Sequence, residues 1–290
     1  MEHSIDVKNK YIAVLITVHN RRAQTMLCLD NLFHIDLPKH ILLDVFLTND
    51  GCTDGTPEEV RQKYPQVIII DGDGTLFWNR GMWNAWDKAS NSKDYDYYLW
   101  LNDDTLLFDD CINVLYNSSL SQNNEAIIVG ATVSSENNEK VTYGGRVGRK
   151  IAPLAGYLSE IDHFNGNIVL IPKIVFKILG NLDYYYTHSK GDFDYGIRAR
   201  KKGIKMYQAG SALGICDLHK RIDKWCDPEI PLVERWRFMH KPNGMPPKES
   251  FHFDKKTSLL VAVKNYFTIH LRCLFPSLWL LLGKAKLTEG

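Results

Sequence analysis

Apolar residues in the first half of the chain form short continuous runs, and each run ends in a polar or glycine-containing turn. Residues 11–18 and 97–101 show no polar alternation, which is typical of strands covered on both faces of a sheet. The residues at 26, 29, 32 and 33 are apolar and recur at helical spacing after the first run. Further strands are predicted at residues 44–48, 67–70, 126–129 and 168–171.

Strands and helical stretches therefore alternate through about residue 130, and this order predicts the fold class. We expect an α/β, Rossmann-like domain with a mostly parallel sheet and helices on both faces. Residues 141–167 are glycine-rich and irregular. A helix over residues 173–179 ends at Gly180, and a second helix runs from Asp192 to a closing Gly203, with its acids first and its bases last.

The end of the chain predicts an appendage to this domain. Residues 225–247 are rich in proline and predict an ordered loop or a lid. Residues 255–286 contain six basic residues, no acidic residue and apolar residues at helical spacing, with a break at Pro276. Such an amphipathic helix pair suits an anionic membrane surface; the alternative is packing on the domain or on a second subunit of a homo-oligomer. The predicted domains are residues 1–222 and 223–290.

Composition narrows the class of protein. The 35 basic and 34 acidic residues nearly balance, which argues against a nucleic-acid partner. The six cysteines are scattered without a CxxC pair, as in a reduced, cytosolic protein. The first ten residues have no apolar signal core, and the late apolar run at 274–282 is far shorter than the roughly 20 residues of a membrane span. The predicted location is the cytoplasm, with peripheral contact to the inner face of the cell membrane left open.

Acidic residues follow two of the predicted strands. Asp103 and Asp104 come directly after the strand at 97–101, and Asp50 and Asp54 lie in a glycine-containing loop after the strand at 44–48. In open α/β sheets, ligands bind beyond the carboxyl ends of the strands. Adjacent acids there can hold a hard cation such as Mg²⁺ or Mn²⁺ together with an anionic ligand; the plain alternative is a turn or a helix cap.

Three of the seven tryptophans lie within nine positions, from Trp78 to Trp86. Either they form the core-facing side of a helix, or Phe77, Trp78 and Trp83 line a pocket for a flat, polar-edged ligand such as a sugar or a base. In a sugar pocket, the aromatic faces would pack on the ring and the neighbouring amides of Asn79 and Asn84 would read its hydroxyl groups.

The ordered set of motifs resembles one family. Residues 14–20, 48–56, 101–105 and 165–167 and the helix opening at Asp192 together resemble the inverting family-two glycosyltransferases of the GT-A fold. The likeness is greatest to bacterial rhamnosyl- and galactofuranosyl-type enzymes of surface polysaccharide synthesis, and it covers about residues 11–219. It implies transfer of a hexosyl unit from a nucleoside diphosphate sugar to a glycan or lipid-linked glycan acceptor, with Mg²⁺ or Mn²⁺.

The resemblance also implies roles for single residues. Asp50, with Asp54 nearby, would contact the nucleotide base; Asp104 would bind the metal; and Asp103 would contact the ribose or the surroundings of the metal. Asp192 would be the catalytic base, and His219 would complete the metal site. The remaining donor-binding candidates are Thr17, His19, Asn20, Trp78, Asn79, Trp83 and Asn84.

Two residues depart from the family pattern. Asn102 stands where many relatives have an acid, which lowers the charge of the metal site but leaves an amide oxygen there. Gly191 stands where relatives often have a second acid beside the base, so the base is either Asp192 or Asp194. These two acids point about 200° apart on a helix, and only one of them can face the cleft.

Two other functions compete with this interpretation. A nucleotidyltransferase would be expected to show a glycine-rich, basic phosphate loop after the first strand, whereas the turn at 17–22 has no glycine. A non-catalytic sugar-binding or scaffold protein could retain the same fold, and Asn102 and Gly191 favour it most.

Overall fold

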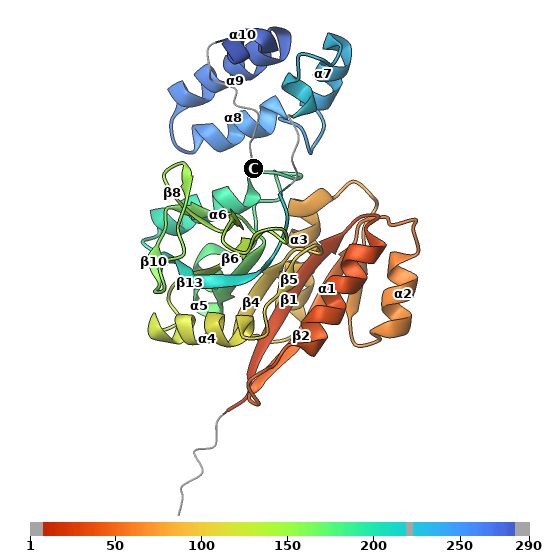
Figure 1. Cartoon of the computed structure of the whole chain (residues 1–290), viewed down its shortest axis with the longest axis vertical. Helices are drawn as coiled ribbons and strands as arrows, with labels where there is room; N and C mark the ends of the chain where they lie inside the picture. Colours follow the sequence, from red (N-terminus) through yellow and green to blue (C-terminus); the bar gives the residue numbers. More distant parts are fainter. Residues whose placement is uncertain (1–7, 219–222, 282–290) are drawn as a thin grey trace, which may run out of the picture. The chain divides into compact units, whose positions relative to one another are not determined.

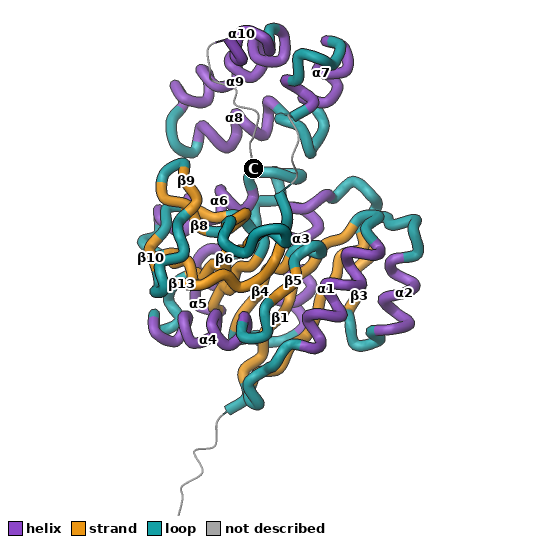
Figure 2. The backbone as a smooth tube through the Cα atoms, viewed as in Figure 1, coloured by secondary structure: helices purple, strands orange, loops and turns teal. Residues whose placement is uncertain are grey.

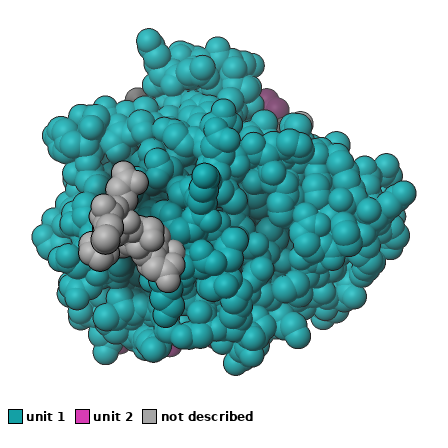
Figure 3. All heavy atoms as spheres, turned by 90° about the horizontal axis from the view of Figure 1, so that it is seen from below, with its two compact units in different colours: residues 1–184, 191–217 teal, residues 185–190, 218–290 magenta. Residues whose placement is uncertain are grey.

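The structure is a computed structural model that describes residues 8–218 and 223–281, and these residues form two compact units. Figure 3 shows the surface of unit 1 in teal. Unit 1 comprises residues 8–184 and 191–217. Unit 2 comprises residues 185–190, 218 and 223–281. The predicted domain boundary after residue 222 falls at the edge of the gap in the described chain.

Strands and helices alternate through the first part of unit 1, in the order that the apolar runs predict (Figure 1). The elements are β1 (Lys10–Val18), α1 (Arg22–His34), β2 (Ile41–Asn49), α2 (Thr56–Lys63), β3 (Ile68–Asp71), α3 (Phe77–Ser92), β4 (Tyr97–Leu101), β5 (Leu106–Leu107), α4 (Cys111–Ser121) and β6 (Ile127–Val133).

The second part of unit 1 is less regular. The glycine-rich stretch predicted to be irregular contains five short strands, three of which form a small separate sheet in the order β11-β8-β9. The elements are β7 (Val141–Tyr143), β8 (Gly145–Val147), β9 (Lys150–Ile151), β10 (Ser159–Glu160), β11 (His163–Phe164), β12 (Ile168–Pro172), α5 (Lys173–Leu179), α6 (Gly191–Lys201) and β13 (Met206–Ile215).

The main sheet confirms the predicted α/β class. Its strand order is β10-β13-β6-β12-β4-β1-β2-β3; in addition, β5 pairs with β13 and β7 pairs with β6. Figure 2 shows the strands in orange and the helices around them in purple. β3, β2, β1 and β4 are parallel to one another, and β13 is parallel to β6. β12 lies antiparallel between β4 and β6. The start of β12 therefore lies at the same edge of the sheet as the carboxyl ends of β1, β2 and β4.

Both faces of this sheet are buried, which explains why its strands are apolar without alternation. In β1, Ile12, Val14 and Ile16 pack with residues of α1, α2 and α4 in one core cluster. Ala13 and Leu15, which point to the other face, pack with residues of α3, α5 and α6 in the second cluster. Because successive side chains of a strand point to opposite faces, each residue of the run meets one of the two helical layers.

Unit 2 is helical, which corrects the prediction of a loop or lid over residues 225–247. This segment contains a short 3₁₀ helix and α7, and its prolines mark helix starts: Pro231 precedes α7, and Pro247 opens α8. The predicted break at Pro276 is confirmed, because α9 ends at Leu274 and α10 begins at Pro276. The elements are η1 (Lys224–Cys226), α7 (Leu232–Met239), α8 (Pro247–Lys255), α9 (Leu259–Leu274) and α10 (Pro276–Leu281).

Within the described ranges, we find no helix with the length and hydropathy that a bilayer crossing requires.

Candidate active site

Polar residues gather where the parallel strands of the main sheet end. The turn after β1 supplies His19, Asn20 and Arg21, and the turn after β4 supplies Asp103 and Asp104. β1 and β4 are neighbours in the sheet, so their carboxyl ends lie side by side. The sheet therefore brings together residues that are about 80 positions apart in the chain.

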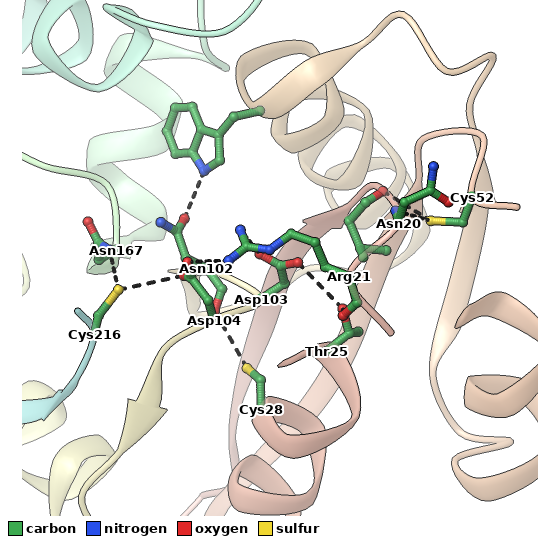
Figure 4. Close-up of polar contacts among 12 residues, drawn as sticks. Asn20, Arg21, Thr25, Cys28, Cys52, Asn102, Asp103, Asp104, Asn167 and Cys216 are labelled. Carbon is green, nitrogen blue, oxygen red and sulfur yellow. Dashed lines mark hydrogen bonds and ion pairs between the residues drawn. The ribbon is translucent and has the colours of Figure 1, made fainter. Parts of the chain in front are cut away.

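Arg21 joins the two acids that follow β4 (Figure 4). Its Nη1 lies 3.2 Å from Asp103 Oδ1, and its Nη2 lies 2.6 Å from Asp104 Oδ2. Thr25 of α1 donates its hydroxyl to the second oxygen of Asp103 at 3.4 Å. Burial raises the pKa of Asp103 to about 7; Arg21 opposes this rise and Asp104 adds to it. Two acids and one guanidinium thus share a site that is largely shielded from water.

Cys216 and Asn167 border the acid pair on another side (Figure 4). Cys216, just after β13, places its Sγ 3.6 Å from Asp104 Oδ1, and Asn167 donates an amide N–H to the same sulfur at 3.4 Å. Burial raises the pKa of Cys216 to about 12, so the thiol keeps its proton and donates it toward Asp104. The backbone carbonyl of Asn167 accepts a hydrogen bond from the backbone N–H of Asn102 at 3.1 Å.

Asn102 has a partner that accounts for an amide at this position. The indole Nε1–H of Trp78 donates to Asn102 Oδ1 at 2.8 Å. Gly166 lies against the same indole, because a Cβ on that glycine would come within 2.6 Å of the ring. The first tryptophan of α3 is therefore fixed between the loop after β4 and the loop before β12.

Asp192 stands at the start of α6, as predicted, and next to Gly166. Its Oδ2 accepts the backbone N–H of Gly166 at 3.1 Å, and its Oδ1 accepts that of Phe193 at 2.8 Å. Burial raises the pKa of Asp192 to about 6, and the two backbone hydrogen bonds hold it below what burial alone would give. The residue as a whole is half-buried. Through Gly166 and Trp78, this carboxylate connects to Asn102 and so to the acid pair.

Asp194 faces the interior instead. It is fully buried, and its Oδ2 lies 3.1 Å from Nε of Arg198, one turn further along α6. Arg198 also donates to the carbonyls of Leu179 and Asn181. Of the two acids at the start of α6, Asp194 therefore belongs to the packing of the helix, and Asp192 belongs to the site.

Gly191 is required by the packing of α6 on α3. A Cβ at this position would come within 1.7 Å of Asn79 Oδ1, a buried residue whose Nδ2 donates to the carbonyl of Asp183 at 2.9 Å. The second acid that relatives often place here could not fit without moving Asn79. The departure at Gly191 thus reflects a close helix contact.

Asp50 binds the backbone of its own unit. Its Oδ1 accepts the N–H groups of Gly74 and Leu76 at 2.9 and 3.1 Å, and its Oδ2 accepts that of Phe77 at 2.8 Å. These bonds fix the turn into α3, where Phe77 has a positive φ of 54°. The residue is buried, and its carboxylate accepts three hydrogen bonds from the protein itself. Its contact with a nucleotide base stays a prediction.

The remaining residues after β1 and β2 brace the two turns against each other. Asn20, with a positive φ of 51°, accepts the backbone N–H of Thr53 at 2.7 Å, and Asp54 accepts that of Arg22 at 3.0 Å. Burial would raise the pKa of Asp54, but its hydrogen bonds from Thr56 and Arg22 outweigh burial and lower it. Nδ1 of His19 lies 2.5 Å from the backbone carbonyl oxygen of Asp50. This nitrogen carries the hydrogen, because a carbonyl oxygen can only accept a hydrogen bond.

The other donor-site candidates lie along β1 and α3. Thr17 packs against Gly81, whose hypothetical Cβ would come within 2.1 Å of Thr17 Oγ1. Trp83 packs edge-on against Tyr184 at 5.0 Å, and its carbonyl accepts the amide of Asn181. Asn84 is half-buried on the same helix. Trp86 is buried in the core, as the first interpretation of the tryptophan cluster expects, and Trp78 reaches the acid-bearing loop. That Phe77, Trp78 and Trp83 line a ligand pocket stays a prediction.

The acids present suit a cation that is held jointly with a bound ligand. Within the described residues, no group of three or more His, Cys, Asp and Glu side chains could hold a metal ion. His219, which was predicted to bind the metal together with Asp104, lies outside the described residues. Mg²⁺ is often bound by one or two carboxylates together with substrate phosphates, and Asp103 and Asp104 meet that requirement.

Arg21, Gly166 and Cys216 belong to the site but were not predicted as members of it. Arg21 had a signal in the sequence, because it follows the first strand at the edge where the acids were expected. Gly166 lies in the 165–167 motif but had no predicted role. For Cys216 the sequence carries no such signal, since a buried cysteine after a strand is ordinary.

Residues 13–222 of the chain match the protein-family model of glycosyl transferase family 2. The chain is similar in structure to Staphylococcus aureus TarS, at 9% identity and a TM-score of 0.54, over 90% of this chain and 43% of TarS. It is also similar to the structure of S. aureus TarS 1-349 in complex with UDP, at 12% identity and a TM-score of 0.52. This match covers 72% of this chain and 60% of that one.

A further similar structure is the mannosyltransferase PcManGT from Pyrobaculum calidifontis in complex with GDP-Man and Mn²⁺. It matches at 13% identity and a TM-score of 0.54, over 97% of this chain and 89% of that one. At these identities the likeness establishes a shared fold. Among curated proteins, none matches the sequence.

Proposed function

This chain belongs to glycosyl transferase family 2, and from that premise we propose that it transfers a hexosyl unit, rhamnosyl- or galactosyl-like, with inversion at the anomeric carbon. The donor would be a nucleoside diphosphate sugar, and the acceptor a hydroxyl group of a glycan or a lipid-linked glycan. The observation that carries the proposal is the position of Asp192. It is the acid of α6 that faces the loops of the acid pair, whereas Asp194 is buried against Arg198.

Asp192 is suited to be the base. Inverting transfer needs one carboxylate that takes the proton from the acceptor oxygen while this oxygen attacks C1 and the bond from C1 to the phosphate oxygen breaks. No covalent intermediate on the protein is required, in contrast to retaining glycosidases. The pKa of Asp192 is raised to about 6, which makes it a stronger base than an ordinary aspartate while leaving it largely ionised at neutral pH.

The acid pair is suited to the diphosphate end of the donor. Asp104, with Asp103 beside it, would hold a Mg²⁺ or Mn²⁺ ion, which when bound would offset the negative charge on the leaving diphosphate. Arg21 adds a fixed positive charge at the same place, because its guanidinium contacts both carboxylates. In this proposal a neutral Cys216 thiol and the amide of Asn167 keep Asp104 oriented.

A binding experiment can identify the nucleotide base and the sugar of the donor. UDP bound to TarS and GDP-Man bound to PcManGT support a nucleoside diphosphate sugar as the ligand class. We would screen UDP-, dTDP- and GDP-sugars by thermal shift, with and without Mn²⁺, on the wild type and on Asp104→Ala. A ligand that binds only the folded state raises the unfolding temperature by mass action.

One donor should stabilise the wild type only when Mn²⁺ is present, and it should fail to stabilise Asp104→Ala. Asp109→Ala, which changes another acid soon after β4, is the matched control and should retain the full shift. If every donor leaves the wild type unchanged, or if the shift persists in Asp104→Ala, the proposed use of the acid pair is wrong.

A further inference from the structure

Helix α9 of unit 2 is apolar on two separate faces. Its inner face includes Ala262 and Cys273, which are buried; Cys273 packs with Trp225, Cys226 and Met239. A second face, centred about 130° away, carries five exposed apolar residues, which we call the outward row: Leu260, Val263, Phe267, Leu271 and Leu274. At 100° per residue these five fall within an arc of about 80°. The inner face explains how the helix packs, whereas the outward row is unexplained by the fold.

The outward row is long and strongly exposed. Leu260 is 83% exposed and Phe267 is 62% exposed, and the row extends over the whole helix. Helix α10 packs on α9 and exposes Leu278 and Leu281 as well. Single exposed apolar residues are normal in soluble proteins, but a contiguous row of them marks an interaction surface.

The segment that carries the outward row is basic. Residues 255–281 contain Lys255, Lys256, Lys264 and Arg272 and no Asp or Glu, a net charge of +4 from four basic and zero acidic residues. Arg272 lies about 140° from the centre of the row and stacks on Trp225, so Lys264 is the charge beside the row, and Lys255 and Lys256 precede the helix. Lys264 is exposed and lies about 40° from Leu260 around the helix. A second copy of the chain that covered this face symmetrically would bring the same positive charges together. An anionic surface would instead be attracted.

We propose that the outward row of α9 binds the surface of an anionic lipid bilayer, with the helix lying in the plane of the headgroups. A helix of 16 residues is about 24 Å long, too short to cross a bilayer, but its apolar row and basic flanks suit the interface. Trp236 lies beside the row through its ring contact with His270 at 5.6 Å, and tryptophan is enriched at such interfaces. This proposal is independent of the proposed transferase activity.

The test is vesicle flotation of the full chain. Vesicles of phosphatidylcholine alone would be compared with vesicles that also contain phosphatidylglycerol, at low and high salt. The wild type should float with the anionic vesicles, and less so at high salt. Phe267→Asp combined with Leu271→Asp should lower the partition coefficient at least about tenfold, because both side chains would leave the apolar boundary.

The matched control is Val147→Asp combined with Ile178→Asp in unit 1, which changes two residues of similar exposure and adds the same charge. This control should float like the wild type. Lys255→Gln combined with Lys264→Gln gives a second test that keeps the outward row intact; each change should weaken binding to anionic vesicles by about fivefold at low salt.

Three outcomes would overturn the proposal. The wild type fails to float with anionic vesicles, or the Asp double variant floats equally well. The third outcome is that light scattering shows a dimer that this variant dissociates while neither protein floats, which would assign the outward row to a second copy of the chain.

Discussion

The two acidic regions of the site are built differently. Asp103 and Asp104 share a fixed cation, because the Arg21 guanidinium contacts both. Asp192 accepts two backbone N–H groups, and no cationic side chain is within ion-pair distance of it in the described part of the chain. Asp192 can therefore take up a proton without breaking an ion pair, whereas protonation of the acid pair would weaken its contacts with Arg21. In the proposed function, Asp192 accordingly transfers the proton and the acid pair binds positive charge.

The largest expected effect comes from removing the proton acceptor. Asp192→Asn keeps the size of the side chain but abolishes the base, so kcat should fall by about 10² to 10⁴. Donor binding should persist, because the acid pair is unchanged. Steady-state kinetics and the donor thermal shift would be measured on the same preparation.

Asp194→Asn is the informative counterpart of that variant. It lies two positions along α6 but faces Arg198 in the core, so it should lower the unfolding temperature while the folded fraction retains kcat. If Asp194→Asn abolished turnover in folded protein and Asp192→Asn did not, the assignment of the two acids would be reversed.

The second effect concerns the cation of the acid pair. Arg21→Gln removes the positive charge that competes with a metal ion for Asp103 and Asp104, so Mn²⁺ should bind the nucleotide-free protein more tightly. Because Arg21 is about one-third exposed, we expect roughly tenfold rather than the larger factor of a buried pair. Titration followed by electron paramagnetic resonance would measure it.

Arg22→Gln provides the control for this measurement. Arg22 follows Arg21 in the chain but pairs with Glu59, away from the acid pair. Its Mn²⁺ affinity should equal that of the wild type. Equal affinities for the wild type and Arg21→Gln would mean that Arg21 does not compete for the metal position.

Much of the fold and part of the site could be predicted from the sequence, because those features are local. The helix break at Pro276 follows from the residues around it. The same is true of the strand ends that carry the acids and of the start of α6 at Asp192. Helix α7 was missed because it is only eight residues long, and the prolines around it suggested a loop.

The rest depends on contacts between distant residues. Arg21 meets Asp103 only because β1 and β4 are neighbours, and Gly191 is explained only by Asn79, more than a hundred residues earlier. The three N–H groups on Asp50 likewise come from a turn more than twenty residues later in the chain. Strand order and helix contacts of this kind leave no local pattern in one sequence.

The smallest effect is the dependence of kcat/KM on pH, and it tests the contrast between Asp192 and the acid pair most directly. A base must be deprotonated, and the pKa of Asp192 is raised from 3.8 to about 6, so kcat/KM for the acceptor should be constant above that pH and fall below it. The fall should approach tenfold per pH unit. Saturating donor and Mn²⁺ keep the acid pair in its cation-bound form throughout.

The same shift predicts the sign of a stability effect. Because the folded state holds the proton of Asp192 more tightly than the unfolded state, Asp192 contributes stability below about pH 4, and this contribution is lost as the pH rises through about 6. Asp192→Asn should remove that loss, so its unfolding free energy should decline less than that of the wild type between these two pH values. A wild-type acceptor profile that stayed flat down to pH 5 would exclude a base with the pKa of Asp192. The proton would then have to leave through another group, even if the acid pair bound metal and donor as proposed.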